Sequence, residues 1–283
     1  MFDKFKNRLE ITGTLTTVTA LRISKGRSTE AIGSDLPVIK DALGRPLIPG
    51  SSFKGALRSR LESFLRGIDP NLAEDPANYT SPTKNKQVKD FKDEHKNNDF
   101  ELTQQLLDIT DDIGSLFGTP WIASKFQVRD LTVQPDAWFG QYQERDGVAI
   151  DRDTETAADG KLYDYQVVPA ATPFDFKAVV ENAHDWELGL LMIGLHQFET
   201  EQIPLGGGRS RGLGVVKLEI DKMRWIDAED HPEFLLEYLK KLVMGDETAY
   251  EDAADYKDEW VHKLIDRLTR KETKLSEAQT QAQ

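Results

Sequence analysis

The chain has 283 residues, of which 39% are hydrophobic and 30% are charged, and its formal net charge is -13. This length suits one large domain or two small ones, with a packed core that carries long solvated segments. The absence of cysteine excludes disulfides, thiolate zinc sites and cysteine catalysis. The sequence shows neither a bilayer-spanning stretch nor a secretory signal after MFDKFKNRLE, so we expect a cytoplasmic protein.

The charge is unevenly distributed along the chain. Residues 1–68 carry 12 Lys and Arg against 6 Asp and Glu, whereas residues 69–112 carry 5 against 11. Phosphate binding depends on the local field, which physiological salt screens over about 8 Å, more than on the total charge. A basic N-terminal part is therefore compatible with nucleic-acid binding, although charge alone favours an ordinary acidic protein with a mildly basic end.

The N-terminal part predicts a strand, a polar loop and a helix. Residues 8–24 alternate apolar and polar side chains, which indicates a strand or a bulged pair of strands. A polar, glycine-containing loop follows at 25–35. Apolar residues recur at spacings of three and four between residues 57 and 68, which is typical of an amphipathic helix. Ser51 and Ser52 are its candidate N-caps.

The middle of the chain predicts less regular structure. Residues 69–112 are polar and rich in Asn, Asp and Lys, which indicates an insertion that is partly disordered. The segment KFQVRDLTV is a predicted strand. Residues 134–165 hold many charges and small residues, which suggests an extended hairpin or a long loop.

The C-terminal part returns to strong periodicity. Residues 174–180 alternate as a strand, and DWELGLLMIGLHQF predicts a buried helix with Asp185 as its N-cap. Residues 216–220 alternate as another strand. Residues 232–243 and 249–271 predict two amphipathic helices.

This order of elements predicts an α+β fold with a ferredoxin-like, RRM-like core. We expect an RNA-binding domain over residues 1–220 with insertions at about 69–112 and 134–165. Residues 221–283 would form a C-terminal helical extension. RNA-recognition domains often use this fold, but a fold alone does not assign a function.

The segment PVIKDALGRPLIPGSSFKGALRSR contains the first candidate site. Pro49 and Gly50 set a turn, two serines follow, and Lys54 and Arg58 lie four residues apart on the predicted helix. A helix N-terminus with flanking cations is a natural phosphate site. Such junctions are common, so spacing alone favours a capping role.

The segment LGGGRSRGLGVV contains the second candidate site. Its glycines allow the backbone to approach a ligand closely, and its arginines supply charge and forked donors. This combination favours a loop that binds a ribose-phosphate backbone over a loop that is only a flexible hairpin turn. The candidate residues here are Gly206, Gly207, Gly208, Arg209, Ser210, Arg211, Gly212 and Gly214.

The segment SDLPVIKDALGRPLIPGSSFKGALR closely resembles the N-terminal signature of RAMP backbone subunits, especially the Csm type. LGGGRSRGLG resembles the superfamily's C-terminal glycine loop, and GVAIDRDTETAADGKLYDYQVVPAATPFDFKAVV resembles its thumb hairpin and following core strand. The resemblance covers most of residues 8–220. It is strong at 35–58 and 205–214 and looser between them.

The resemblance implies a subunit that stacks along a CRISPR guide RNA in a type III antiviral effector complex. Its thumb, at about 145–165, would displace one base pair of the guide–target duplex. The expected partners are the guide RNA, single-stranded target RNA, further copies or related RAMP subunits, and the complex's large and small subunits. We expect head-to-tail contacts between copies. The implied RNA-binding residues are Ser51, Ser52, Lys54, Arg58, Gly207, Gly208, Arg209, Ser210, Arg211, Ile150 and Arg152.

Asp35 matches the aspartate that cleaves target RNA in this family. The implied reaction is a metal-dependent attack of a ribose 2′-hydroxyl on the adjacent phosphate, as in an endoribonuclease that uses a divalent metal such as Mg²⁺. Asp35 would act as general base or would hold the metal. From the sequence alone, a turn-forming Asp after Gly33 and Ser34 is the simpler explanation. Asp41 is expected to shape its own turn.

Three other functions remain open at this point. The chain can be a non-cleaving structural subunit of the same complex, a RAMP-type processing endoribonuclease, or an unrelated protein that binds a small phosphorylated ligand. A processing enzyme would need a catalytic His or a Tyr–Lys set near the glycine loop, and none of the five histidines lies there. Their spacing also predicts no zinc site.

Overall fold

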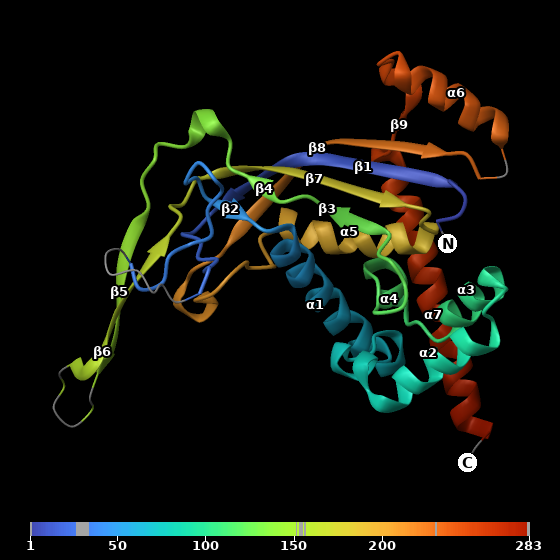
Figure 1. Cartoon of the computed structure of the whole chain (residues 1–283), viewed down its shortest axis with the longest axis horizontal. Helices are drawn as coiled ribbons and strands as arrows, with labels where there is room; N and C mark the ends of the chain where they lie inside the picture. Colours follow the sequence, from blue (N-terminus) through green and yellow to red (C-terminus); the bar gives the residue numbers. More distant parts are fainter. Residues whose placement is uncertain are drawn as a thin grey trace.

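The computed structural model describes residues 2–26, 34–150, 152, 155, 157–229 and 231–281. It is a mixed α+β structure with a central antiparallel sheet, which confirms the predicted class (Figure 1). The strands are β1 (Asn7–Thr17), β2 (Leu47–Ile48), β3 (Phe126–Val128), β4 (Leu131–Thr132), β5 (Gln143–Ile150), β6 (Ala157–Val167), β7 (Pro173–Glu181), β8 (Val216–Asp227) and β9 (Glu251–Asp252). The α-helices are α1 (Gly50–Ile68), α2 (Pro82–Glu94), α3 (Asp99–Asp108), α4 (Asp112–Phe117), α5 (Asp185–Glu199), α6 (Pro232–Val243) and α7 (Lys257–Gln281).

The central sheet has the strand order β3-β7-β1-β8-β9, and every neighbouring pair is antiparallel. In β1 every second side chain is buried, from Asn7 through Leu9, Ile11 and Leu15 to Thr17, because alternate residues of a strand point to opposite faces. The predicted strand at 8–24 is shorter than expected: after Thr17 the chain makes only isolated bridges, at Leu21 and Ser24.

Helices α1 and α5 lie on the buried face of this sheet (Figure 1). Phe53 of α1 stacks on Phe198 of α5 with ring centroids 4.3 Å apart, and it contacts Phe176 of β7 at 5.0 Å. All three rings are almost fully buried. The predicted apolar stripe of α1 and the nearly all-apolar helix α5 therefore form the centre of the core.

The expectation of partial disorder at 69–112 is wrong. The segment forms α2 and α3, with short 3-10 turns before them. Val88 and Leu106 are buried with Ile122 in a small apolar cluster of their own, against which Trp121 also packs. The few apolar residues of this stretch fall on the inner faces of two helices, so a low average hydrophobicity is still enough for a packed layer.

Two predicted helix starts are also wrong. Helix α1 begins at Gly50, so Ser51 and Ser52 lie inside its first turn and Pro49 is the N-cap. The Gly50 N–H donates instead to Asp130 Oδ1 at 2.8 Å. Helix α5 has His184 as N-cap, one residue before Asp185, and the His184 N–H donates to Glu187 Oε2 at 2.8 Å.

The C-terminal part also differs in detail from the prediction. The helix expected at 249–271 begins only at Lys257, because residues 251–252 form β9 and pair with β8. Strand β8 continues through residue 220 to Asp227, so the expected domain boundary falls inside a strand, and the division stays a prediction.

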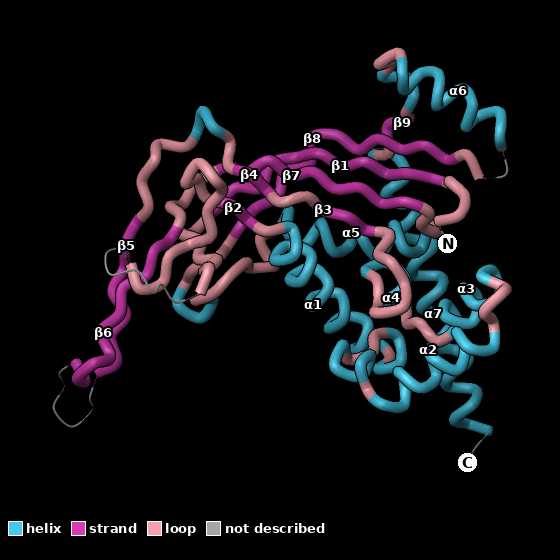
Figure 2. The backbone as a smooth tube through the Cα atoms, in the orientation of Figure 1, coloured by secondary structure: helices cyan, strands magenta, loops and turns pink. Residues whose placement is uncertain are grey.

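Strands β5 and β6 form an antiparallel hairpin that projects from the end of the sheet (Figure 1). It bears out the extended hairpin predicted within 134–165. Figure 2 shows that loops gather at its base, whereas α1 to α5 and α7 lie towards the other end of the molecule.

Candidate nucleic-acid interface

Three segments predicted as functional meet at the base of the hairpin. The Asp35 N–H donates to Asp164 Oδ1 at 2.7 Å, and the Asp164 N–H donates to Asp35 Oδ2 at 3.4 Å. Leu36 forms a parallel bridge with Tyr165, so the Asp35 segment lies along β6. We call Asp35, Asp164, Tyr163, Tyr165, Arg22 and Arg211 the hairpin junction.

The glycine loop is tightly folded rather than a flexible turn. The Gly207 N–H donates to the Arg22 carbonyl at 2.8 Å, and the Leu205 N–H donates to the Gly214 carbonyl at 2.8 Å. Gly206 has φ +73°, and a Cβ there would lie 2.1 Å from the Arg22 oxygen. Only glycine tolerates both conditions, so this residue is required by the loop's fold.

Side chains of the glycine loop face solvent. Arg209, Ser210 and Arg211 form one 3-10 turn and are exposed. Gly207 is exposed and Gly208 is half-buried. Among the described residues, neither arginine forms an ion pair, so their charges are available to an anion from outside.

Two arginine–tyrosine contacts join the glycine loop and the segment after β1 to β6. Arg211 donates to the Tyr163 hydroxyl at 3.2 Å, and this hydrogen bond with its positive charge lowers the pKa of Tyr163. The Arg22 guanidinium lies 4.8 Å from the centre of the Tyr165 ring. Tyr165 is buried and Tyr163 is only half-buried.

The predicted cations of α1 are bound inside the protein. Lys54 Nζ donates to Ser124 Oγ at 2.6 Å and to the Phe126 carbonyl at 3.0 Å. Burial, assisted by the charge of Arg58, lowers the pKa of Lys54 to about 8. These contacts hold α1 to the chain that leads into β3.

Arg58 is engaged on three sides. It pairs with Glu62 at 2.8 Å and donates to the Gly118 carbonyl at 3.0 Å and to the Tyr79 hydroxyl at 3.2 Å. Ser51 is exposed and Ser52 is half-buried at the start of the same helix. Within the described chain, no contact joins Lys54 or Arg58 to the hairpin junction, and their role in RNA binding stays a prediction.

The tip of the hairpin carries the other two predicted RNA-binding residues. Ile150 ends β5 and pairs with Ala157, but its side chain lies outside the described residues. Arg152 lies in the turn between the strands and is exposed.

The described residues contain no group of three or more His, Asp or Glu side chains that could hold a metal ion. The hairpin junction instead brings two carboxylates together, those of Asp35 and Asp164. Mg²⁺ in enzymes of nucleic acids is commonly bound by one or two carboxylates, with water and substrate phosphates as the other ligands. Asp35 would supply one such carboxylate, whereas Asp164 Oδ1 already accepts the Asp35 N–H.

Reasoning from sequence did not single out Asp164, although it lies in the predicted hairpin. Alternation along β6 places Tyr163, Tyr165 and Val167 on the packed side and Asp164 on the other side. Arg22 was missed because its charge has no motif around it. Its place beside Tyr165 depends on the glycine loop, nearly two hundred residues later in the chain.

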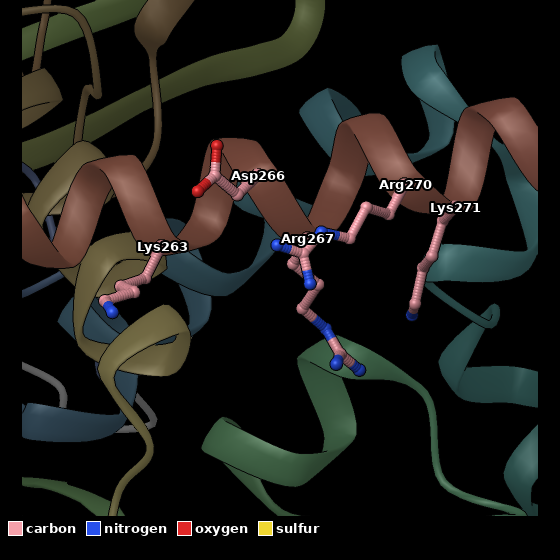
Figure 3. A pocket seen from close by; sticks show the side chains of 5 residues that line it. All are labelled: Lys263, Asp266, Arg267, Arg270 and Lys271. Carbon is pink, nitrogen blue, oxygen red and sulfur yellow. The ribbon is translucent and has the colours of Figure 1, made fainter.

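A separate cavity of about 460 Å³ lies along α7 and is lined by Lys263, Asp266, Arg267, Arg270 and Lys271 (Figure 3). Two of its cations have an internal partner, because Arg267 and Lys271 pair with Asp112 of α4 at 2.9 Å and 2.8 Å. Arg267 also lies 4.1 Å from the centre of the Trp186 ring. These contacts attach α7 to α4 and α5. None of the site residues predicted from the sequence lines this cavity.

None of the described helices is long and apolar enough to cross a membrane.

Comparisons with known proteins agree with the motifs. A relative from Enterococcus italicus, named CRISPR system Cms endoribonuclease Csm3, is 26% identical over 77% of this chain and 92% of its own length. The protein of that name from Methanocaldococcus jannaschii is 29% identical over 77% of this chain and 81% of its own. That from Mycobacterium tuberculosis is 52% identical over 56 residues, which are 19% of this chain and 24% of its own. The model of the RAMP superfamily matches residues 14–217, and the chain therefore belongs to this superfamily.

Proposed function

We propose that this chain is a guide-RNA-binding backbone subunit of a type III CRISPR effector complex and that it cleaves bound target RNA at regular intervals. The observation that carries the proposal is the hairpin junction, where Asp35, the base of a projecting hairpin and an exposed arginine-bearing glycine loop come together. The names of the relatives, all CRISPR endoribonucleases, point to the same activity.

The glycine loop supplies the contacts to the guide backbone. Arg209 and Arg211 are exposed and have no carboxylate partner among the described residues, so phosphates are their natural ligands. Backbone and shape recognition of single-stranded RNA needs such loops rather than base-specific side chains. The local charge supports RNA binding even though the whole chain has a net charge of -13.

The fold supports the same proposal. Strands β1, β3, β7 and β8 with helices α1 and α5 follow the order expected of a ferredoxin-like core, with β9 added at one edge. One face of the sheet carries these helices, as in RRM-like domains. The projecting hairpin β5–β6 is the thumb in this proposal, and α6 and α7 are additions after the core.

Asp35 is the residue for cleavage. Its carboxylate would take the proton of a target 2′-hydroxyl as the 2′-oxygen bonds to the adjacent phosphorus. The bond to the 5′-oxygen would break, and this leaving oxygen would take a proton from water. In the alternative role, Asp35 would hold Mg²⁺ together with water and the target phosphate, and the ion would neutralise charge on the phosphate oxygens. The hairpin would displace a target base, which places the 2′-oxygen in line with the leaving oxygen.

The test is cleavage of labelled target RNA by the reconstituted complex. We expect regularly spaced cuts with Mg²⁺, none with a chelator, and a loss of at least about 100-fold in rate in Asp35→Ala with target binding retained. Target that is bound but uncut by the wild-type complex would identify a structural subunit. Cleavage of guide precursor by the chain alone would identify a processing enzyme.

A further inference from the structure

We infer that Asp164 is a positioning residue for Asp35, so that the base of the hairpin and the cleaving carboxylate form one unit. This inference rests on the proposed function, because it concerns the carboxylate assigned to cleavage. It adds a residue that neither the motifs nor the relatives' names assign.

The two aspartates hold each other by reciprocal hydrogen bonds across 129 residues of chain. Asp164 Oδ1 accepts the Asp35 N–H at 2.7 Å, which places the backbone of Asp35. Asp35 Oδ2 accepts the Asp164 N–H at 3.4 Å, a longer contact that turns the Asp35 carboxylate towards β6. One contact sets the position of the residue, and the other sets the orientation of its side chain.

The residues next to Asp164 in β6 also contact the Asp35 segment. The Gln166 N–H donates to the Leu36 carbonyl at 3.1 Å, and Leu36 bridges to Tyr165, so three successive residues of β6 hold the Asp35 segment. Tyr165 is 8% exposed and has the Arg22 guanidinium over its ring. A displacement of β6 is therefore transmitted to Asp35.

Position matters strongly for this reaction. A general base must lie within hydrogen-bond reach of its proton, and a misplacement of about 1 Å costs on the order of 100-fold in rate. In the proposed function the hairpin also displaces the target base. Strand β6 would therefore help to place both the attacked phosphate and the Asp35 carboxylate.

The test compares Asp164→Ala with Asp164→Asn in the reconstituted complex, at saturating target. The alanine variant lacks the acceptor for the Asp35 N–H, and we expect its cleavage rate to fall about 10- to 100-fold with unchanged target affinity. The asparagine variant keeps an acceptor oxygen without the charge, and we expect a rate within about threefold of wild type. Asp175→Ala is the matched control, since Asp175 is a strand aspartate that accepts a hydrogen bond from Gln134 at 3.2 Å, away from the junction.

Hydrogen exchange gives a second readout that does not depend on cleavage. The peptide that contains the Asp35 amide should exchange faster in Asp164→Ala, and at the wild-type rate in Asp164→Asn and Asp175→Ala. Unchanged cleavage and exchange in Asp164→Ala would overturn the inference. An asparagine variant as slow as the alanine variant would also overturn it, because the charge of Asp164 would then be what acts.

The two proposals can fail separately. If the wild-type complex and Asp175→Ala bind target without cutting it, the proposed cleavage fails whatever Asp164 does. If the wild-type complex cuts and the Asp164 variants cut at the same rate, the cleavage stands and the positioning role fails.

Discussion

The glycine loop and the first turns of α1 both contain cations that lie in family-like motifs, but their surroundings differ. In the glycine loop, Arg209 and Arg211 are exposed and contact a carbonyl and a hydroxyl. On α1, Lys54 and Arg58 are bound to carbonyls, hydroxyls and Glu62 within the protein. The first pair is available to RNA phosphates, whereas the second pair joins α1 to its neighbours.

This difference teaches that a basic residue in an RNA-binding motif does not by itself bind RNA. A cation that already has several internal acceptors must give them up before it can bind a phosphate, and each such bond has a cost of about 1 kcal/mol. We therefore expect substitutions among the packed helices to change stability and substitutions in the glycine loop to change RNA binding.

The largest effect is expected for Glu187→Gln in α5, among the packed helices. Glu187 is fully buried, pairs with the almost fully buried Lys125, and accepts a hydrogen bond from Ser115 at 2.6 Å. Loss of its charge leaves the Lys125 ammonium buried and unpaired, so the free energy of unfolding should fall by about 3–5 kcal/mol in urea denaturation. Glu237→Gln, on an exposed helix, is the control and should leave the midpoint unchanged. If Glu187→Gln lowered RNA affinity without changing stability, the contrast between the packed helices and the glycine loop would fail.

Gly206→Ala and Gly207→Ala should separate folding of the loop from contact with RNA. A Cβ at Gly206 would meet the Arg22 carbonyl at a positive φ, so we expect a loss of about 1–3 kcal/mol in stability together with weaker RNA binding. At Gly207 nothing lies within 4 Å of such a Cβ, so stability should not change. If Gly207→Ala still weakens RNA binding in a titration, RNA backbone approaches this glycine closely.

Arg211→Gln should weaken RNA binding about tenfold without a change in unfolding. One lost phosphate contact should also reduce the slope of log affinity against log salt by about 0.7 for single-stranded RNA. Tyr163→Phe removes the hydroxyl that accepts from Arg211 but keeps the cation, so its salt slope should equal that of wild type. Identical slopes for Arg211→Gln and wild type would exclude a phosphate contact at Arg211.

The smallest effect is a pH dependence from Lys54. Its pKa is lowered to about 8 in the folded chain from the usual 10.5, so above pH 8 the unfolded state binds more protons than the folded state. Stability should therefore rise between pH 8 and pH 10 by this contribution, and Lys54→Met should lack the rise. Urea denaturation at pH 7.5 and 9.5 measures it. An equal rise in Lys54→Met would assign it to another group.

Much of the fold follows from local patterns. The apolar stripe of α1, the all-apolar run of α5 and the alternation in β7 and β8 identified their elements, because burial of one face imposes a period of 3.6 or 2. The helices of 69–112 were missed since their few apolar residues form a cluster only when α2, α3 and Trp121 come together. Their low average hydrophobicity resembles that of a disordered segment.

The sequence by itself determined the family, the hairpin and the candidate residues Asp35, Arg209 and Arg211, because these lie in continuous motifs. Only the tertiary structure decided which of the candidates meet. It placed Asp164 against Asp35 across 129 residues and bound Lys54 to Ser124 across 70 residues. Hydrogen-bond partners depend on distances in space, and no spacing along the chain encodes contacts made between strands and helices so far apart in sequence.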